Sequence, residues 1–214
     1  MNTADKPSVA GNYAGNYAGT YAELHCISHY SFLRGASHPE ELVRQAARLG
    51  YHALAITDEC SMAGIVKAHV AAREHGLKLI VGSEFYLDDN THLVLLAPNR
   101  IGYGQICNLI TVGRRRATKG SYDLGLKDTE FGLDQCLAIW LPEPARQAPS
   151  ADTRKQQGEH LQAASVGQLL ARHFSKRLWL GVQIYPDGQE MATYQQAFSL
   201  ARTLDLPMVA CGDV

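Results

Sequence analysis

The sequence predicts an α/β fold in which seven strands, most of them followed by helices, close into a distorted (βα)7 barrel. Short apolar runs of strand length alternate with longer segments that have helical periodicity. Polar residues also follow the first, second, third and last of the predicted strands. The first and last strands of an open sheet seldom share a site, whereas in a closed barrel they are neighbours. We therefore expect parallel strands whose C-terminal ends deliver polar groups to one rim.

The elements can be placed in order along the chain. Apolar runs predict strands at residues 21–25, 53–57, 78–87, 93–96, 136–141, 178–184 and 207–211. The polar residues 88–90 predict a turn from which the fourth strand returns. Helical spacing predicts helices at 37–50, 62–75, 103–116, 166–176 and 189–204. The first helix is expected to start with a capping box of Ser37 and Glu40 and to end at Gly50.

Two segments do not fit the alternation of strands and helices. Residues 1–20 contain three short Gly-Asn-Tyr-Ala-like repeats, which predict a flexible tail, with a tyrosine binding stripe as the alternative. Residues 142–165 are rich in Pro, Gln, Ala and charged residues and predict a mobile insertion. The folded domain is therefore expected to span residues 21–214.

Composition narrows the class of protein. Of 214 residues, 46% are apolar and 19% charged, and the net charge is −1, so the whole domain does not attract nucleic acid electrostatically. The five cysteines form no CxxC pair, which favours reduced thiols over a disulfide framework. The absence of a secretory segment and of a long apolar run predicts a cytoplasmic protein with no membrane partner.

Residue types that bind metals stand at the predicted rim. His25 ends the first strand, Asp58 and Glu59 follow the second, Glu84 ends the segment 78–84 of the third, and Asp213 follows the last. Such a set can hold metal ions that activate water for phosphoester hydrolysis. The alternative is a relic site whose polar groups pair with one another.

Several long segments, in order, resemble one family. They are Tyr-Ala-Glu-Leu-His at 21–25, Ser-Phe-Leu-Arg-Gly-Ala-Ser-His-Pro-Glu-Glu-Leu-Val at 31–43, Ala-Leu-Ala-Ile-Thr-Asp-Glu-Cys-Ser-Met-Ala-Gly at 53–64, His-Leu-Val-Leu-Leu-Ala at 92–97 and Gly-Arg-Arg-Arg-Ala-Thr-Lys-Gly at 113–120. From residue 21 to 214 the chain resembles the N-terminal PHP domain (polymerase and histidinol phosphatase) of bacterial C-family DNA polymerases, in the error-prone, damage-associated branch. The resemblance implies a PHP-type barrel and adds His92 to the candidate metal ligands.

The chain departs from the family's ligand pattern at several positions. The family's His-x-His becomes His25-Cys-Ile, and Arg34 stands where relatives often carry an acid. The family's Asp-His becomes Asp58-Glu59, which favours Mg²⁺ or Mn²⁺ over zinc. The family's last His would follow Asp213, and the chain stops at Val214, so we expect a domain truncated before that ligand. Arg34 is expected to neutralise the carboxylates by bonding two of them.

The resemblance implies an error-prone, translesion DNA polymerase as the full-length protein, with Mg²⁺ as its cofactor and catalytic residues outside this chain. The domain itself is expected to support the polymerase, with no required cofactor and at most weak Mn²⁺, Mg²⁺ or Zn²⁺ binding at the rim. Two alternatives are a metal-dependent PHP phosphoesterase and an interaction module for DNA-repair partners. The expected partners are the downstream polymerase domains, DNA and damage-response accessory proteins.

One basic cluster is a candidate for DNA contact. It contains Arg114, Arg115, Arg116 and Lys119 at the end of a predicted helix. These cations could bind phosphates. They could equally form a solvated helix end, where positive charge complements the helix dipole.

Overall fold

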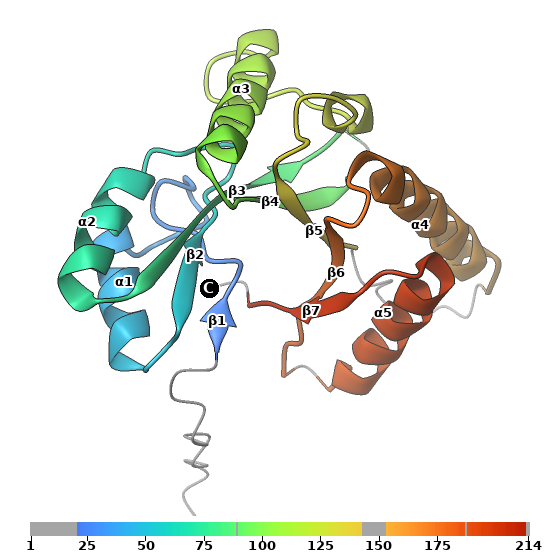
Figure 1. The fold of residues 1–214 in the computed structure, drawn as a ribbon. Coiled ribbons are helices and arrows are strands. Elements are labelled where there is room, and N and C mark those ends of the chain that lie inside the picture. The colour runs from blue at the N-terminus through green and yellow to red at the C-terminus, as the bar shows by residue number, and fades with distance from the viewer. Residues whose placement is uncertain (1–20, 89, 143–152, 187, 213–214) are drawn as a thin grey trace, which may run out of the picture.

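The strands form one curled sheet whose order follows the chain. The computed structural model describes residues 21–88, 90–142, 153–186 and 188–212. The strands are β1 (Ala22–Glu23), β2 (Ala53–Ile56), β3 (Lys78–Tyr86), β4 (His92–Ala97), β5 (Leu137–Leu141), β6 (Leu178–Val182) and β7 (Met208–Ala210). Figure 1 shows the sheet curling until β7 lies near β1, with the helices on the outside. The predicted α/β barrel class is confirmed, as a curled sheet with a gap in its pairing.

The sheet is not fully parallel. β1, β2 and β3 pair in parallel, as do β5, β6 and β7. β4 runs antiparallel to both β3 and β5. The general expectation of parallel strands does not hold for β4, whereas the expected return of the fourth strand after a turn is confirmed, because β4 pairs with β3 as a hairpin. This reversal brings the first residue of β4 to the same rim as the C-terminal ends of the other strands.

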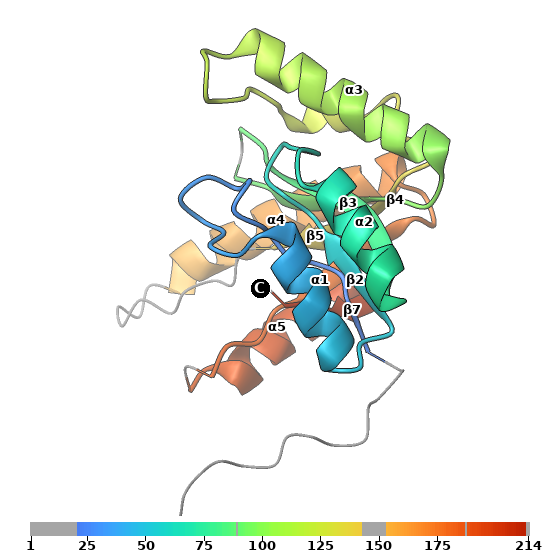
Figure 2. The ribbon, with the colours of Figure 1, turned by 90° about the vertical axis from the view of Figure 1, so that its left-hand side faces the viewer.

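The helices cover the outer face of the sheet (Figure 2). They are α1 (Pro39–Arg48), α2 (Ile65–His75), α3 (Arg100–Arg116), α4 (Thr153–His173) and α5 (Glu190–Leu204), with a short 3-10 turn η1 (Leu126–Thr129). Among the described residues no helix is long and apolar enough to cross a membrane.

The observed helix starts differ from the expected ones by a few residues in α1, α2 and α3, and by much more in α4. In α1 the backbone N–H of His38 donates to Glu41 at 2.8 Å, so the cap lies one residue later than the expected Ser37–Glu40 pair. Pro39 explains the shift, since proline fits the first helical position, where its missing N–H costs nothing. α4 begins at Thr153, so residues 153–165 of the expected insertion are helical. The expected tail at 1–20 and residues 143–152 lie outside the described residues.

Alternate residues of the strands pack on opposite faces of the sheet. Leu54 and Ile56 of β2 pack outward with α1 and α2, whereas Ala55 between them faces inward. A larger outer cluster packs β3 to β6 against α3, α4 and α5, with Phe85 and Phe174 fully buried. The inward cluster fills the interior of the curled sheet and consists of Ala55, Val94, Leu96, Ile139, Leu141 and Cys211.

The seam between β1 and β7 is closed by polar groups. The backbone N–H of Gly212 donates to the Glu23 carboxylate at 2.9 Å. The carbonyl of Gly212 lies 3.1 Å from His25 Nδ1 and accepts a 2.9 Å bond from the Gln183 amide. We define these four residues as the seam. Because His25 also belongs to the rim, the seam and the candidate site share one side chain.

Candidate metal centre

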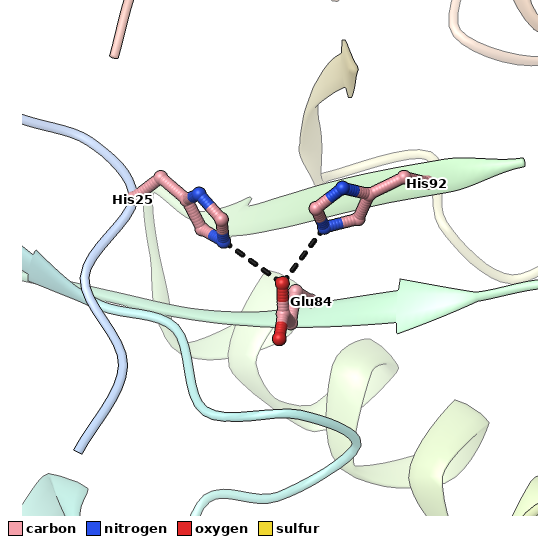
Figure 3. A group of neighbouring side chains, drawn as sticks. All are labelled: His25, Glu84 and His92. Atoms are coloured by element: carbon pink, nitrogen blue, oxygen red, sulfur yellow. Dashed lines mark hydrogen bonds and ion pairs between the residues drawn. The ribbon is translucent and has the colours of Figure 1, made fainter. Parts of the chain in front are cut away.

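Three side chains from different elements converge at the rim. His25 follows β1, Glu84 lies in the second half of β3, and His92 is the first residue of β4 (Figure 3). Glu84 pairs with Val94 in the β3–β4 register, and Val94 belongs to the inward cluster, so Glu84 points into the barrel. His92 reaches the same rim because β4 is reversed.

The cluster of His25, Glu84 and His92 is buried and compact. One carboxylate oxygen of Glu84 lies 2.9 Å from His25 Nε2 and 2.7 Å from His92 Nε2. The two imidazole rings meet edge to face at a centroid separation of 5.4 Å. Burial by itself raises the pKa of Glu84, but the bonds from the two histidines outweigh it and hold the pKa at about 2. Glu84 is therefore an anion at neutral pH.

Two imidazole nitrogens and one carboxylate oxygen form a donor set that binds zinc and other divalent transition metals. The three ligand atoms all lie within 4.8 Å of one another. Neighbouring ligands at about 2.0–2.2 Å from a metal stand roughly 3–3.5 Å apart. The observed separations of 2.7 and 2.9 Å need only a small expansion to admit an ion. The set fits one metal ion.

The contacts of His25 Nδ1 decide what Nε2 can do. The Gln183 amide nitrogen lies 2.9 Å from Nδ1. If Nδ1 accepts that N–H, the ring proton sits on Nε2 and is donated to Glu84. If Nδ1–H instead donates to the Gly212 carbonyl, the lone pair of Nε2 is free for a metal. The contacts of the seam therefore fit both tautomers of His25: one donates to Glu84, and the other can bind a metal.

Arg34 fills the space on the other side of Glu84. Its Nη1 donates to the second Glu84 oxygen and, at 2.9 Å, to Glu59 Oε2. Its Nη2 donates to the Tyr86 hydroxyl at 3.3 Å, and the guanidinium stacks over the Tyr86 ring, which in turn stacks on His92 at 4.2 Å. Burial by itself lowers the pKa of Arg34. The Glu84 charge and the bonds to Glu59 and Glu84 outweigh that effect and raise the pKa above its usual value, so Arg34 is always a cation. The expected contact with two carboxylates is present.

Asp58 and Glu59 are neighbours in sequence, but their side chains have different hydrogen-bond partners. Glu59 faces Arg34 and also accepts a 2.9 Å bond from the Tyr122 hydroxyl. Asp58 turns toward the loop after β1, where it accepts bonds from the Ser28 backbone N–H at 2.7 Å and from the hydroxyls of Ser28 and Ser31. Asp58 is therefore outside the three-residue cluster and organises the loop. Asp213 lies outside the described residues.

The basic cluster separates into two pairs. Arg114 donates to the backbone carbonyls of Cys60 and Ser121, both at 3.2 Å, and Arg116 holds Asp128 at 2.7 and 2.8 Å. Two of the four cations, Arg114 and Arg116, are therefore bonded within the protein at the end of α3. Arg115 and Lys119 are exposed and remain the two candidates for phosphate contact.

Three further side chains contact the site but were not predicted from the sequence: Gln183, Tyr86 and Tyr122. Gln183 directly follows β6, so the rule that polar groups after strands reach the rim would have identified it. Tyr86 and Tyr122 carry no such signal, because aromatic residues at strand ends and in loops are usually packing groups.

Comparison with known proteins identifies the class. Residues 23–138 match the model of the PHP domain, and the chain belongs to the PHP family. Solved structures with this fold include a protein from Bifidobacterium adolescentis described as a metal-dependent phosphoesterase, with a TM-score of 0.59, 15% identity and coverage of 90% of this chain and 86% of that one. Another is an amidohydrolase from Chromobacterium violaceum with bound sulfate and no metal, with a TM-score of 0.55, 16% identity and the same coverage.

Much more similar sequences belong to one kind of protein. An error-prone DNA polymerase of Methylococcus capsulatus is 52% identical over 194 residues, and one of Pseudomonas paraeruginosa is 52% identical over 192 residues. Each alignment covers 90% of this chain but 17% of the polymerase. The chain therefore corresponds to a small part of these much longer relatives.

Proposed function

We propose that this chain is the N-terminal PHP domain of an error-prone DNA polymerase that copies damaged templates in the cytoplasm. The domain supports the polymerase domains and does not hydrolyse phosphoesters. The identity of 52% to two error-prone polymerases supports the assignment to that protein. Nucleotide addition, its Mg²⁺ ions, and contacts with DNA and damage-response partners would belong to the whole protein.

The observation that carries the structural role is the position of Arg34. A site that holds two or three metal ions needs carboxylates free to bridge them. Here the guanidinium bonds both Glu59 and Glu84, and so takes the charge-balancing place of a second cation. The cluster of His25, Glu84 and His92 then remains as a site for one ion at most.

The phosphoesterase alternative rests on that same cluster. A bound ion would supply Lewis-acid activation of water. Within this chain the residues would hold the ion through two nitrogens and one oxygen, while Arg34 would face the substrate phosphate. The third alternative, a module that docks repair proteins, is supported only by exposed apolar side chains.

The test uses the highly purified chain with Mn²⁺, Zn²⁺ or Mg²⁺, an aryl phosphomonoester and a 3′-labelled DNA oligonucleotide. We expect no hydrolysis above that of the Glu84→Ala variant, and at most one bound metal ion per chain. An Arg73→Ala variant is the matched control, since it changes an exposed cation on α2 away from the cluster. Divalent-metal-dependent hydrolysis that disappears in Glu84→Ala and persists in Arg73→Ala would establish the phosphoesterase instead.

The supporting role is tested in a chimera. This chain replaces the corresponding segment of the Methylococcus capsulatus polymerase, to which it is 52% identical. We expect the chimera to extend primers and to unfold at a higher temperature than the same polymerase without the segment. Equal stability and extension without any PHP domain would reject a supporting role.

A further inference from the structure

The loop between β1 and α1 exposes two large apolar side chains at its tip. Phe32 is 84% exposed and Leu33 is 89% exposed, the two highest values among the large apolar residues that the structure describes. In Figure 2 this blue loop projects from one side of the molecule. Single exposed apolar residues are common on proteins, but two adjacent ones at the tip of a projecting loop form a patch.

The loop is held on both sides of these two residues. On one side, the Ser31 hydroxyl donates to Asp58 at 2.8 Å and accepts the Glu59 backbone N–H at 2.9 Å. On the other side, Arg34 is bonded to Glu59 and Glu84. The tip is therefore fixed between two anchors that rest on the rim itself.

The backbone of the tip is a tight turn. The N–H groups of Arg34 and Gly35 both donate to the Ser31 carbonyl, at 3.0 and 2.9 Å. Leu33 has φ +62°, a left-handed conformation that costs energy for any residue with a branched side chain and no local compensation. Leu33 is therefore held in an exposed position by a constrained backbone. A rigid apolar tip loses little conformational entropy when a partner buries it.

The size of the patch decides the kind of partner. A stable interface with a separate protein buries about 800 Å² on each side, whereas two such side chains offer roughly 300 Å². A contact this small suffices within one chain, because a covalent tether gives effective concentrations in the millimolar range. The polymerases similar to this chain are much longer, since the alignment covers only 17% of each.

We propose that Phe32 and Leu33 are a docking element that inserts into an apolar pocket on the polymerase part of the same protein. The proposal rests on the proposed function, since it takes that polymerase part as the occupant. It also gives Arg34 a second role, because the residue that neutralises Glu59 and Glu84 sets the position of the docking element.

The test measures how fast a maleimide labels a Leu33→Cys variant, read by mass spectrometry of the peptide that contains position 33. The variant is made in the isolated chain and in the Methylococcus capsulatus chimera, both with Cys107→Ser. We expect labelling to be at least tenfold slower in the chimera. Phe32→Ser in the chimera should restore most of the labelling rate. The matched control is Val66→Ser with Val70→Ser, which changes an exposed apolar pair on α2 and should leave the rate unchanged.

Each outcome separates the docking element from the supporting role. Equal labelling in both proteins rejects the docking element, even if the chimera extends primers and the supporting role stands. Slower labelling in the isolated chain at high concentration, with a dimer in sedimentation, makes a second copy the occupant and also rejects it. Protection in the chimera that is lost on Phe32→Ser supports the docking element whether or not primer extension depends on the domain.

Discussion

Removal of the Arg34 side chain tests the electrostatics of the rim most directly. Arg34→Ala leaves the fully buried Glu84 carboxylate with only its two histidine partners among the bonds described here, and leaves Glu59 with Tyr122. The side chains of Arg34 and Glu59 are 30% and 28% exposed, so solvent screens the bond between them. That pair contributes at most about 1 kcal/mol.

The bond to Glu84 sets most of the expected loss. Hydrogen bonds to charged groups contribute about 1.5–3 kcal/mol, and the solvent near Arg34 places this one in the lower half of that range. We expect Arg34→Ala to lower the free energy of unfolding by about 2–3 kcal/mol. For a chain of this size the shift in Tm is about 4–12 °C.

The assay is urea unfolding followed by circular dichroism at pH 7 in the presence of a chelator. Arg115→Ala is the control, since loss of an exposed cation should change stability by less than about 0.5 kcal/mol. In chelator-free buffer, Mn²⁺ should stabilise Arg34→Ala more than the parent, because the carboxylates are then free to bind the ion. If Arg34→Ala unfolds at the same urea concentration as the parent, the guanidinium does not balance charge at the rim.

Two further predictions concern Asp58 and the thiols. Asp58→Ala should destabilise the chain by about 3 kcal/mol or more, because Ser28 and Ser31 lose the buried acceptor that orders the loop. The number of metal ions bound per chain should stay the same. A variant that unfolds like the parent, or that loses metal, would contradict this. Burial raises the pKa of Cys60 to about 11, so at pH 8 about one Cys60 thiol in a thousand is ionised. Iodoacetamide should therefore modify the half-buried Cys107 first. Cys60 should react only as the pH rises toward its pKa. Equal rates at pH 8 would show that the Cys60 thiol is not shielded.

The positions of the strands could be predicted because each is an apolar run bounded by turn residues. Only the second half of α4 was predicted, as a helix at 166–176, and its first half was the main omission. That first half contains Gln, Arg, Lys and Glu, which form helices readily but leave no apolar stripe to detect. The return of β4 could be predicted from the short turn before it. That this return brings His92 to the rim depends on the pairing of β4 with β5 as well as with β3.

The candidate site was predictable in part for a physical reason. Strand ends define a rim, so His25 and Glu84 could be placed there from their positions alone. Which way a side chain points after the strand has ended is decided by the loops, and Asp58 and Glu59 illustrate this. The serines of the β1 loop attract Asp58, whereas Arg34 and Tyr122 attract Glu59. No periodicity in the sequence encodes that choice.

The seam at Gly212 has a consequence for how such a domain changes over evolutionary time. His25 and Glu23 are the groups that join the end of the last strand to the start of the first. A chain that had abandoned metal chemistry would still lose one of the contacts that close its barrel if His25 were replaced. Part of a metal site can therefore persist under selection for folding alone, and its presence in a sequence is weaker evidence of catalysis than its chemistry suggests.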